Sequence, residues 1–142
     1  MYRIDRILKD SFKKVLVEKN PNSPFITGRL QLGVFEFLLL APATSNTVAK
    51  IAHGISDTML TNAVIQSLKA YVPVIVMPVD YYEGSTITVL PNGKKLKLRV
   101  RKEDAENVKK ISAMDGITTF ENPEELRKIF EKIENHACHK SR

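Results

Sequence analysis

Two apolar runs that carry almost no charge constrain the fold of this chain more than any other feature. They cover residues 34–40 and 74–79, and glycine or proline lies close to their ends. Such runs are typical of strands that are covered on both faces, as the strands of parallel sheets are. Helical spacing fills the stretch between them, and strand, helices and strand in this order predict a βαβ unit with a right-handed crossover. The sequence therefore predicts an α/β fold around a parallel sheet.

Four consecutive polar residues follow the first apolar run, and we call them the polar quartet. A helical pattern starts within them, and Asp57 opens a second helix, where we interpret it as a cap rather than a ligand contact. A helix N-terminus at the carboxyl end of a strand offers free N–H groups and a partial positive charge. The quartet would therefore hold a phosphate, a carboxylate or the polar edge of a planar cofactor, or it would only cap the helix. Its members are Thr44, Ser45, Asn46 and Thr47.

The remaining elements follow from periodicity and turn signals. They are an amphipathic helix over residues 4–18, a loop as far as Gly33, a hairpin over 85–101, a helix over 103–114, a strand over 117–120 and a helix that starts within 122–125. At about 150 residues per domain, the 142 residues predict one domain. We assign residues 1–135 to it and expect a loose tail over 136–142.

The predicted hairpin carries the densest positive charge of the chain. In its second strand leucines alternate with basic residues, which predicts one apolar face and one basic face. The basic face would dock an acidic partner such as ferredoxin, or nucleic acid, or would be a solvated face that protects an edge strand. The absence of interleaved aromatic residues disfavours nucleic acid. The basic residues are Lys95, Lys97, Arg99 and Arg101.

Composition excludes several classes of protein. No apolar run approaches the ~20 residues that span a bilayer, and the charged start lacks a signal-peptide core. Cys138 is the only cysteine, which excludes an internal disulfide and a four-cysteine cluster and makes a cytoplasmic setting the default. The short pattern over 136–139 is too weak to predict a metal site. The net charge of +6 raises the prospect of an anionic partner.

Residues 41–61 read Ala-Pro-Ala-Thr-Ser-Asn-Thr-Val-Ala-Lys-Ile-Ala-His-Gly-Ile-Ser-Asp-Thr-Met-Leu-Thr. This stretch resembles the Pro-Ala-Ser-Ala-Asn-Thr motif and the following Lys-Ile-Ala-x-Gly-Ile-x-Asp-x-Leu-Leu-Thr of the flavoprotein superfamily, which includes phosphopantothenoylcysteine decarboxylase, peptidyl-cysteine decarboxylases and flavin prenyltransferase. Residues 28–33, residues 76–80 and the basic hairpin most resemble the archaeoflavoprotein and dihydromethanopterin reductase branch. The superfamily likeness covers about residues 2–80, and the branch likeness extends to about residue 133.

The resemblance implies a Rossmann-like, flavodoxin-like three-layer fold and bound FMN. It also implies a homo-oligomer, trimeric or higher, in which the flavin lies near a subunit interface. The quartet would contact the isoalloxazine edge through side chains and amides, while Pro42 and Ala43 shape the turn. The cofactor-binding residues that it implies are Ala43, Thr44, Ser45, Asn46 and Thr47, and no catalytic residue is assigned.

Two departures from the family pattern affect these expectations. Family members begin with a strand, a Gly-x-Thr-Gly-like loop that grips the FMN phosphate, a helix and a second strand. This chain starts after those elements, so we expect it to be truncated at the N-terminus. The decarboxylases also carry Pro-x-Met-Asn-x-x-Met-Trp and the prenyltransferases an Arg-Glu pair, whereas residues 78–82 here read Pro-Val-Asp-Tyr-Tyr. We expect His53 to pack or to face solvent.

Three functions remain as hypotheses. The first is an FMN-dependent oxidoreductase or electron carrier between a donor such as ferredoxin and a dihydromethanopterin-like pterin or a protein acceptor. The second is an FMN-dependent decarboxylase of the phosphopantothenoylcysteine type, which the missing Met-Asn segment opposes. The third is a non-catalytic remnant without flavin. Flavin content separates the third hypothesis from the others, and substrates separate the first two.

Overall fold

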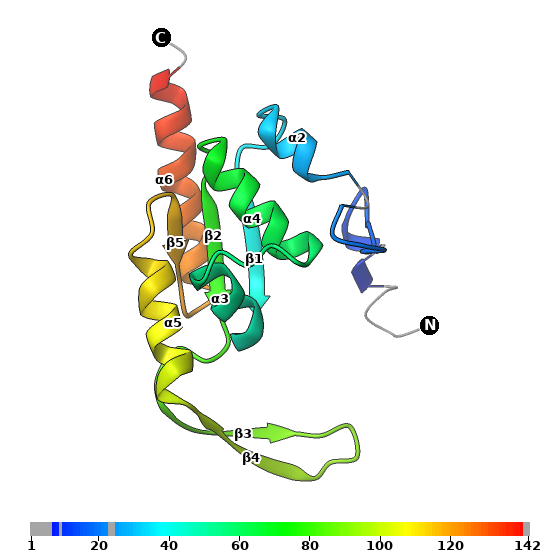
Figure 1. Cartoon of the computed structure of the whole chain (residues 1–142), viewed down its shortest axis with the longest axis vertical. Helices are drawn as coiled ribbons and strands as arrows, with labels where there is room; N and C mark the ends of the chain where they lie inside the picture. Colours follow the sequence, from blue (N-terminus) through cyan, green and yellow to red (C-terminus); the bar gives the residue numbers. More distant parts are fainter. Residues whose placement is uncertain (1–6, 9, 23–24, 141–142) are drawn as a thin grey trace.

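A three-stranded parallel sheet forms the centre of the computed structural model, which describes residues 7–8, 10–22 and 25–140. Its strand order is β1-β2-β5, and Leu38 of β1 and Ile117 of β5 both lie opposite Val74 of β2. The predicted βαβ unit with parallel strands is confirmed (Figure 1). The strands are β1 (Leu38–Ala43), β2 (Val74–Pro78) and β5 (Ile117–Thr119).

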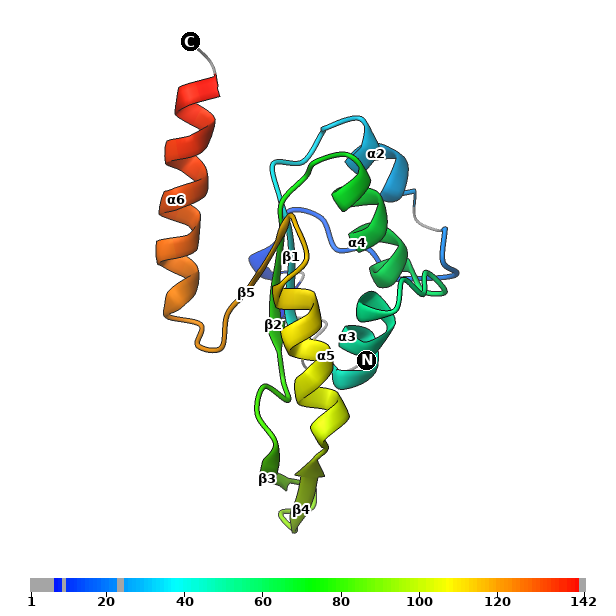
Figure 2. The ribbon, with the colours of Figure 1, turned by 60° about the vertical axis from the view of Figure 1, so that its left-hand side comes forward.

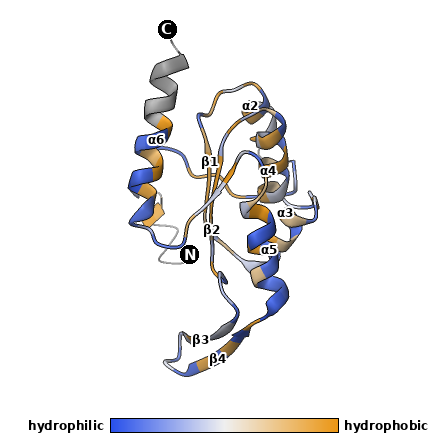
Figure 3. Cartoon of the chain, turned by 90° about the vertical axis from the view of Figure 1, so that its left-hand side faces the viewer, coloured by the Kyte–Doolittle hydropathy of each residue, from blue (hydrophilic) through white to orange (hydrophobic). Residues whose placement is uncertain are grey.

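Helices cover both faces of the sheet. α3, α4 and α5 lie on one side of the sheet with α2 beside α4, and α6 lies on the other side (Figures 2 and 3). The rings of Phe37, just before β1, and Phe130 of α6 lie 5.0 Å apart between centroids. The predicted three-layer α/β fold is confirmed. The helices are α2 (Thr27–Gln31), α3 (Ser45–Ala52), α4 (Met59–Lys69), α5 (Lys102–Ser112) and α6 (Glu125–Lys140).

The core lies where β2 meets the helices of the first face. Val74, Ile75 and Val76 of β2 are at most 1% exposed. Apolar side chains from α3, α4 and α5 pack on the strands, as their 3.6-residue periodicity requires. This burial fixes β1 and β2 side by side, with their carboxyl ends at one edge of the sheet. The helix residues in this core cluster are Val48, Ile51, Ala52, Val64, Val108 and Ile111.

The N-terminal part of the chain departs from its prediction. Residues 7–8 and 10–11 are helical, but the expected helix does not continue over 12–18, and its start lies outside the described residues. Phe12 and Val17 are 61% and 76% exposed, so the burial that would stabilise an amphipathic helix here is missing at these two positions. The expected loop before Gly33 contains the short helix α2 instead, because buried Leu30 anchors it beside α4.

Two further boundaries differ in detail. β1 starts at Leu38 rather than at Val34, which is 53% exposed and belongs to the approach to the sheet. The α6 start is as predicted, because Asn122 and Glu125 exchange side-chain caps with the backbone at its first turn. α6 runs to Lys140, through part of the expected loose tail, and residues 141–142 lie outside the described residues, as do the side chains of 136–139. The single-domain assignment stays a prediction.

The hairpin of β3 (Gly84–Val89) and β4 (Lys95–Val100) projects from the body as an arm (Figures 1 and 2). Its turn is closed by Gly93 N–H donating to the Leu90 carbonyl at 2.8 Å and by Leu90 N–H donating to the Lys94 carbonyl at 2.9 Å. Gly93 has a φ of +80°, which a residue without Cβ adopts freely. This is a three-residue loop with a glycine bulge, and it fixes the strand register.

That register contradicts the predicted division into an apolar and a basic face. Ile87 lies opposite Lys97 and Val89 opposite Lys95, and residues directly opposite each other share a face. The apolar residues of β3 therefore lie on the basic face, while the leucines of β4 share theirs with Thr86 and Thr88. The prediction was wrong because the alternation within each strand does not determine which residues of the other strand share its apolar face. The length of the connecting loop sets the register and so decides this. Among the described residues, no helix is long and apolar enough to cross a membrane.

Candidate functional site

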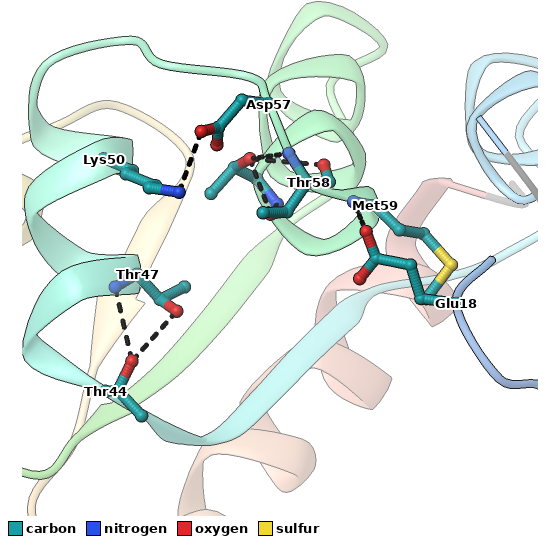
Figure 4. A network of polar contacts seen from close by, with 8 residues as sticks. Glu18, Thr44, Thr47, Lys50, Asp57, Thr58 and Met59 are labelled. Carbon is teal, nitrogen blue, oxygen red and sulfur yellow. Dashed lines mark hydrogen bonds and ion pairs between the residues drawn. The ribbon is translucent and has the colours of Figure 1, made fainter. Parts of the chain in front are cut away.

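The polar quartet forms the turn from β1 into α3. Thr44 has extended backbone angles and is the N-cap of α3, as the sequence predicted. Its side-chain oxygen accepts a hydrogen bond from the Thr47 N–H at 3.4 Å, and the two hydroxyls lie 3.1 Å apart (Figure 4). These contacts satisfy one free donor of the first turn and orient both threonines.

The second quartet residue joins the ends of two strands. The Ser45 hydroxyl donates a hydrogen bond to the carboxylate of Asp80, which follows β2. β1 and β2 bring these groups together, because Ala43 lies opposite Pro78 and the carboxyl ends of parallel strands share an edge. Sequence reasoning treated Asp80 only as part of a strand end. The signal that would have found it is its position directly after the neighbouring strand.

Asn46 is the quartet residue most available to a ligand. It is exposed in the first turn of α3, and its carboxamide has no hydrogen-bond partner among the described residues. The first N–H groups of a helix have no intrahelical acceptor, so those of Ser45 and Asn46 are available as well. The corner thus presents amide donors and the positive end of α3.

Ala43 has a different position from its polar neighbours. Its side chain is 2% exposed within the core cluster, and its carbonyl accepts a hydrogen bond from the Val79 N–H at 3.1 Å. Ala43 therefore holds the turn against β2. The peptide bond between Ala41 and Pro42 is cis.

A line of hydroxyl groups extends the same edge toward β5. Tyr81 and Thr119 are hydrogen-bonded at 3.0 Å between oxygens, and Thr119 lies 2.8 Å from the Ser112 hydroxyl. Beside them, a hydrogen bond to Glu121 raises the pKa of the exposed Tyr82 phenol above its ordinary value. Polar groups thus follow all three parallel strands, and those after β5 were missed by sequence reasoning.

Asp57 does not cap a helix. Thr58 is the N-cap of α4 and exchanges hydrogen bonds with Thr61, while Asp57 pairs with Lys50 of α3 at 2.9 Å (Figure 4). The cap prediction was wrong because the next residue, also a capping type, holds the required extended angles. The ion pair instead connects α3 to the loop before α4. His53 is exposed at the C-terminus of α3.

Comparison with known proteins identifies the family. The family model described as Flavoprotein matches residues 5–137. The chain belongs to this family. An uncharacterised protein of Methanocaldococcus jannaschii is 46% identical over 131 residues, which are 92% of this chain and 70% of that protein. The dihydromethanopterin reductase (acceptor) of the same organism is 30% identical over 169 residues, which cover 82% of this chain and 69% of that one.

A solved structure with bound cofactor also resembles this member of the Flavoprotein family. Burkholderia xenovorans DmrB in complex with FMN, described as a cubic protein cage for redox transfer, is 34% identical with a TM-score of 0.67. The match covers 75% of this chain and 58% of that one. The apo form is 33% identical with a TM-score of 0.73, over 92% of this chain and 70% of the other. The chain therefore spans little more than half of the FMN-bound relative.

Proposed function

We propose that this chain binds FMN at the polar quartet and acts as an oxidoreductase or electron carrier. The observation that carries the proposal is the start of α3, where Asn46 and free N–H groups are exposed at the carboxyl edge of the sheet. Membership of the Flavoprotein family and the FMN complex of DmrB support the choice of ligand.

The donor set suits the edge of an isoalloxazine ring. That edge carries carbonyl oxygens and ring nitrogens, and the corner offers a carboxamide, amide N–H groups and the Thr44 hydroxyl without a cationic side chain in the quartet. When bound, FMN supplies reversible electron transfer, as a hydride or as single electrons. Asn46 and the first-turn N–H groups would donate to the ring edge. The positive end of α3 would stabilise negative charge there, and Asp80 would hold Ser45 in place.

We assign the electron donor to the class of acidic, ferredoxin-like proteins, and the acceptor to a dihydromethanopterin-like pterin or a protein. Lys95, Lys97 and Arg99 are exposed and form no ion pair within the described part of the chain. Such a row of cations would steer an acidic partner to the arm. Two relatives are named dihydromethanopterin reductase (acceptor), which supports the pterin.

We further assign the chain to a homo-oligomer of three or more copies. The description of DmrB as a cubic cage supports this assignment. The cytoplasmic setting stays a prediction from the single cysteine.

The first experiment titrates the purified chain with FMN and follows its visible absorption. Asn46→Ala removes one carboxamide that donates to the ring, so we expect about 3- to 10-fold weaker binding with unchanged helix content. Asn107→Ala, the same change on α5, is the control and should bind FMN like the unchanged chain. Equal FMN affinity in the Asn46→Ala chain would remove Asn46 from the site.

A second experiment tests the donor. The double change Lys97→Glu and Arg99→Glu should slow reduction by a reduced ferredoxin and flatten its dependence on ionic strength. The matched control reverses two exposed lysines of α5, Lys109 and Lys110, and should leave the rate within about twofold. If both double variants are reduced at the same rate, the arm is not the donor's docking site.

A further inference from the structure

The outer edge of β3 is a strand edge without a partner. Among the described residues, β3 pairs only with β4, and the two strands form a separate two-stranded sheet. All six residues of β3 are exposed, and Ile87 and Val89 are each 63% exposed. An isolated two-stranded hairpin is marginally stable in water, so an arm of this kind gains stability from a third strand.

The turn geometry identifies which groups point away from β4. Leu90 N–H donates to the Lys94 carbonyl, and residues of an antiparallel pair alternate between inward and outward hydrogen bonding. Counting back from Leu90, the N–H and C=O groups of Ser85, Ile87 and Val89 point to the open edge. By the same alternation, the N–H and C=O groups of Lys97, which lies opposite Ile87, point away from β3.

The two edges of the arm differ sharply in charge. β4 carries Lys95, Lys97 and Arg99, and lysines along an edge strand are a usual protection against pairing with another chain. β3 reads Gly-Ser-Thr-Ile-Thr-Val, without a charge or a proline and with four β-branched residues. Only one of the two edges is therefore protected.

From this asymmetry we infer that the β3 edge pairs with the β3 edge of a second copy of this chain, antiparallel about a two-fold axis. The resulting four-stranded sheet has the order β4-β3-β3-β4. An isologous contact suits β3, since the same uncharged strand serves as both partners. The inference deepens the proposed homo-oligomer by naming its contact surface.

Electrostatics select this arrangement over the alternative. Pairing through β4 would bring two rows of cations within about 5 Å of each other. Pairing through β3 separates the β4 strands by three strand spacings, about 14 Å, which exceeds the Debye length of about 8 Å at physiological salt. Ile87 and Val89 of both copies then form an apolar stripe between the basic rows.

The test places a proline at each member of one cross-strand pair. Ile87→Pro removes an outward N–H of β3, and Lys97→Pro removes the matching outward N–H of β4, so neither costs a hydrogen bond within the hairpin. Ile87→Thr shortens the side chain but keeps the N–H. Sedimentation velocity and native mass spectrometry of the full chain measure assembly, and circular dichroism verifies that the variants are folded.

We expect Ile87→Pro to need at least a tenfold higher concentration to reach the assembled mass, while Lys97→Pro and Ile87→Thr assemble within about threefold of the unchanged chain. Three results would overturn the inference: unaltered assembly of Ile87→Pro, equal loss in Lys97→Pro, or an unchanged chain that stays a single copy at about 100 μM. FMN binding, measured on the same samples, reports separately on the proposed function. Assembly without FMN binding would refute that function and leave the β3 contact standing.

Discussion

The parallel sheet and the hairpin arm are built from similar residues, but these residues are buried in the sheet and exposed in the arm. Val74, Ile75 and Val76 of β2 are at most 1% exposed, whereas Ile87 and Val89 of β3 are 63% exposed. Both segments are rich in β-branched residues, which favour strands in either setting. The sheet is buried by helices of its own chain, whereas the side chains of β3 are covered by nothing in the described part of the chain. In Figure 3, hydrophobic colours gather along β1 and β2 between the helices.

The largest expected effect compares one substitution in both regions. Ile111 of α5 is fully buried in the core, so Ile111→Ala should lower the free energy of unfolding by about 2–5 kcal/mol. Ile87→Ala on the exposed arm should lower it by less than about 0.5 kcal/mol. Denaturant unfolding at a concentration where the chain sediments as its smallest species measures both. Equal losses would show that the arm is packed on its own chain.

The next effect compares two glycines with nearly equal φ angles. Gly116 has a φ of +82° and Gly93 a φ of +80°, so alanine is strained at both. A Cβ at Gly116 would lie 3.0 Å from Leu68 Cδ2, whereas one at Gly93 would meet nothing within 4 Å. We expect Gly93→Ala to cost about 1 kcal/mol and Gly116→Ala visibly more, by thermal unfolding. A larger cost at Gly93 would place a contact at the tip of the arm.

The smallest effect concerns the junction between the regions. The Arg101 guanidinium beside Asp104, at 2.6 Å and 3.0 Å to its two oxygens, holds the pKa of Asp104 below its ordinary value. The stabilisation by the ionised carboxylate is therefore present above about pH 4 and is lost as the pH falls through the lowered pKa. Asp104→Asn should thus be less stable than the unchanged chain at pH 7, and this difference should shrink toward pH 2.

Equilibrium unfolding at the two pH values measures that difference. A gap between the two chains that stays constant with pH would mean that the carboxylate's charge contributes nothing at the junction.

Local signals in the sequence predict most of the body. The runs of β1 and β2, the N-cap within the polar quartet and the start of α6 are all found, because burial and capping leave patterns over a few residues. Residues 12–18 had the periodicity of a helix, but Phe12 and Val17 stay exposed, because periodicity does not report whether a surface is available to bury them. The prediction that Asp57 is a helix cap failed because Asp57 and Thr58 are both of a capping type, and only their backbone angles show which of them caps α4.

The candidate site was predictable in its position but not in its connections. The order of the predicted elements places the quartet directly after the end of a strand. The bond from Ser45 to Asp80 and the chain from Tyr81 through Thr119 to Ser112 join residues 7 to 38 positions apart, and only strand order brings them together. The register of the arm depends in the same way on one loop length.

One buried residue in the arm has an evolutionary consequence. Val100, at 7% exposure, is the only buried residue of β3 and β4, so at the other strand positions a change of side chain costs the core of its own chain nothing. Selection on those positions then acts through whatever the arm contacts. Among family members, variation in the arm should be limited by what the arm contacts, whereas variation in β2 should be limited by the hydrophobic core. The two regions should therefore diverge at different rates within one gene.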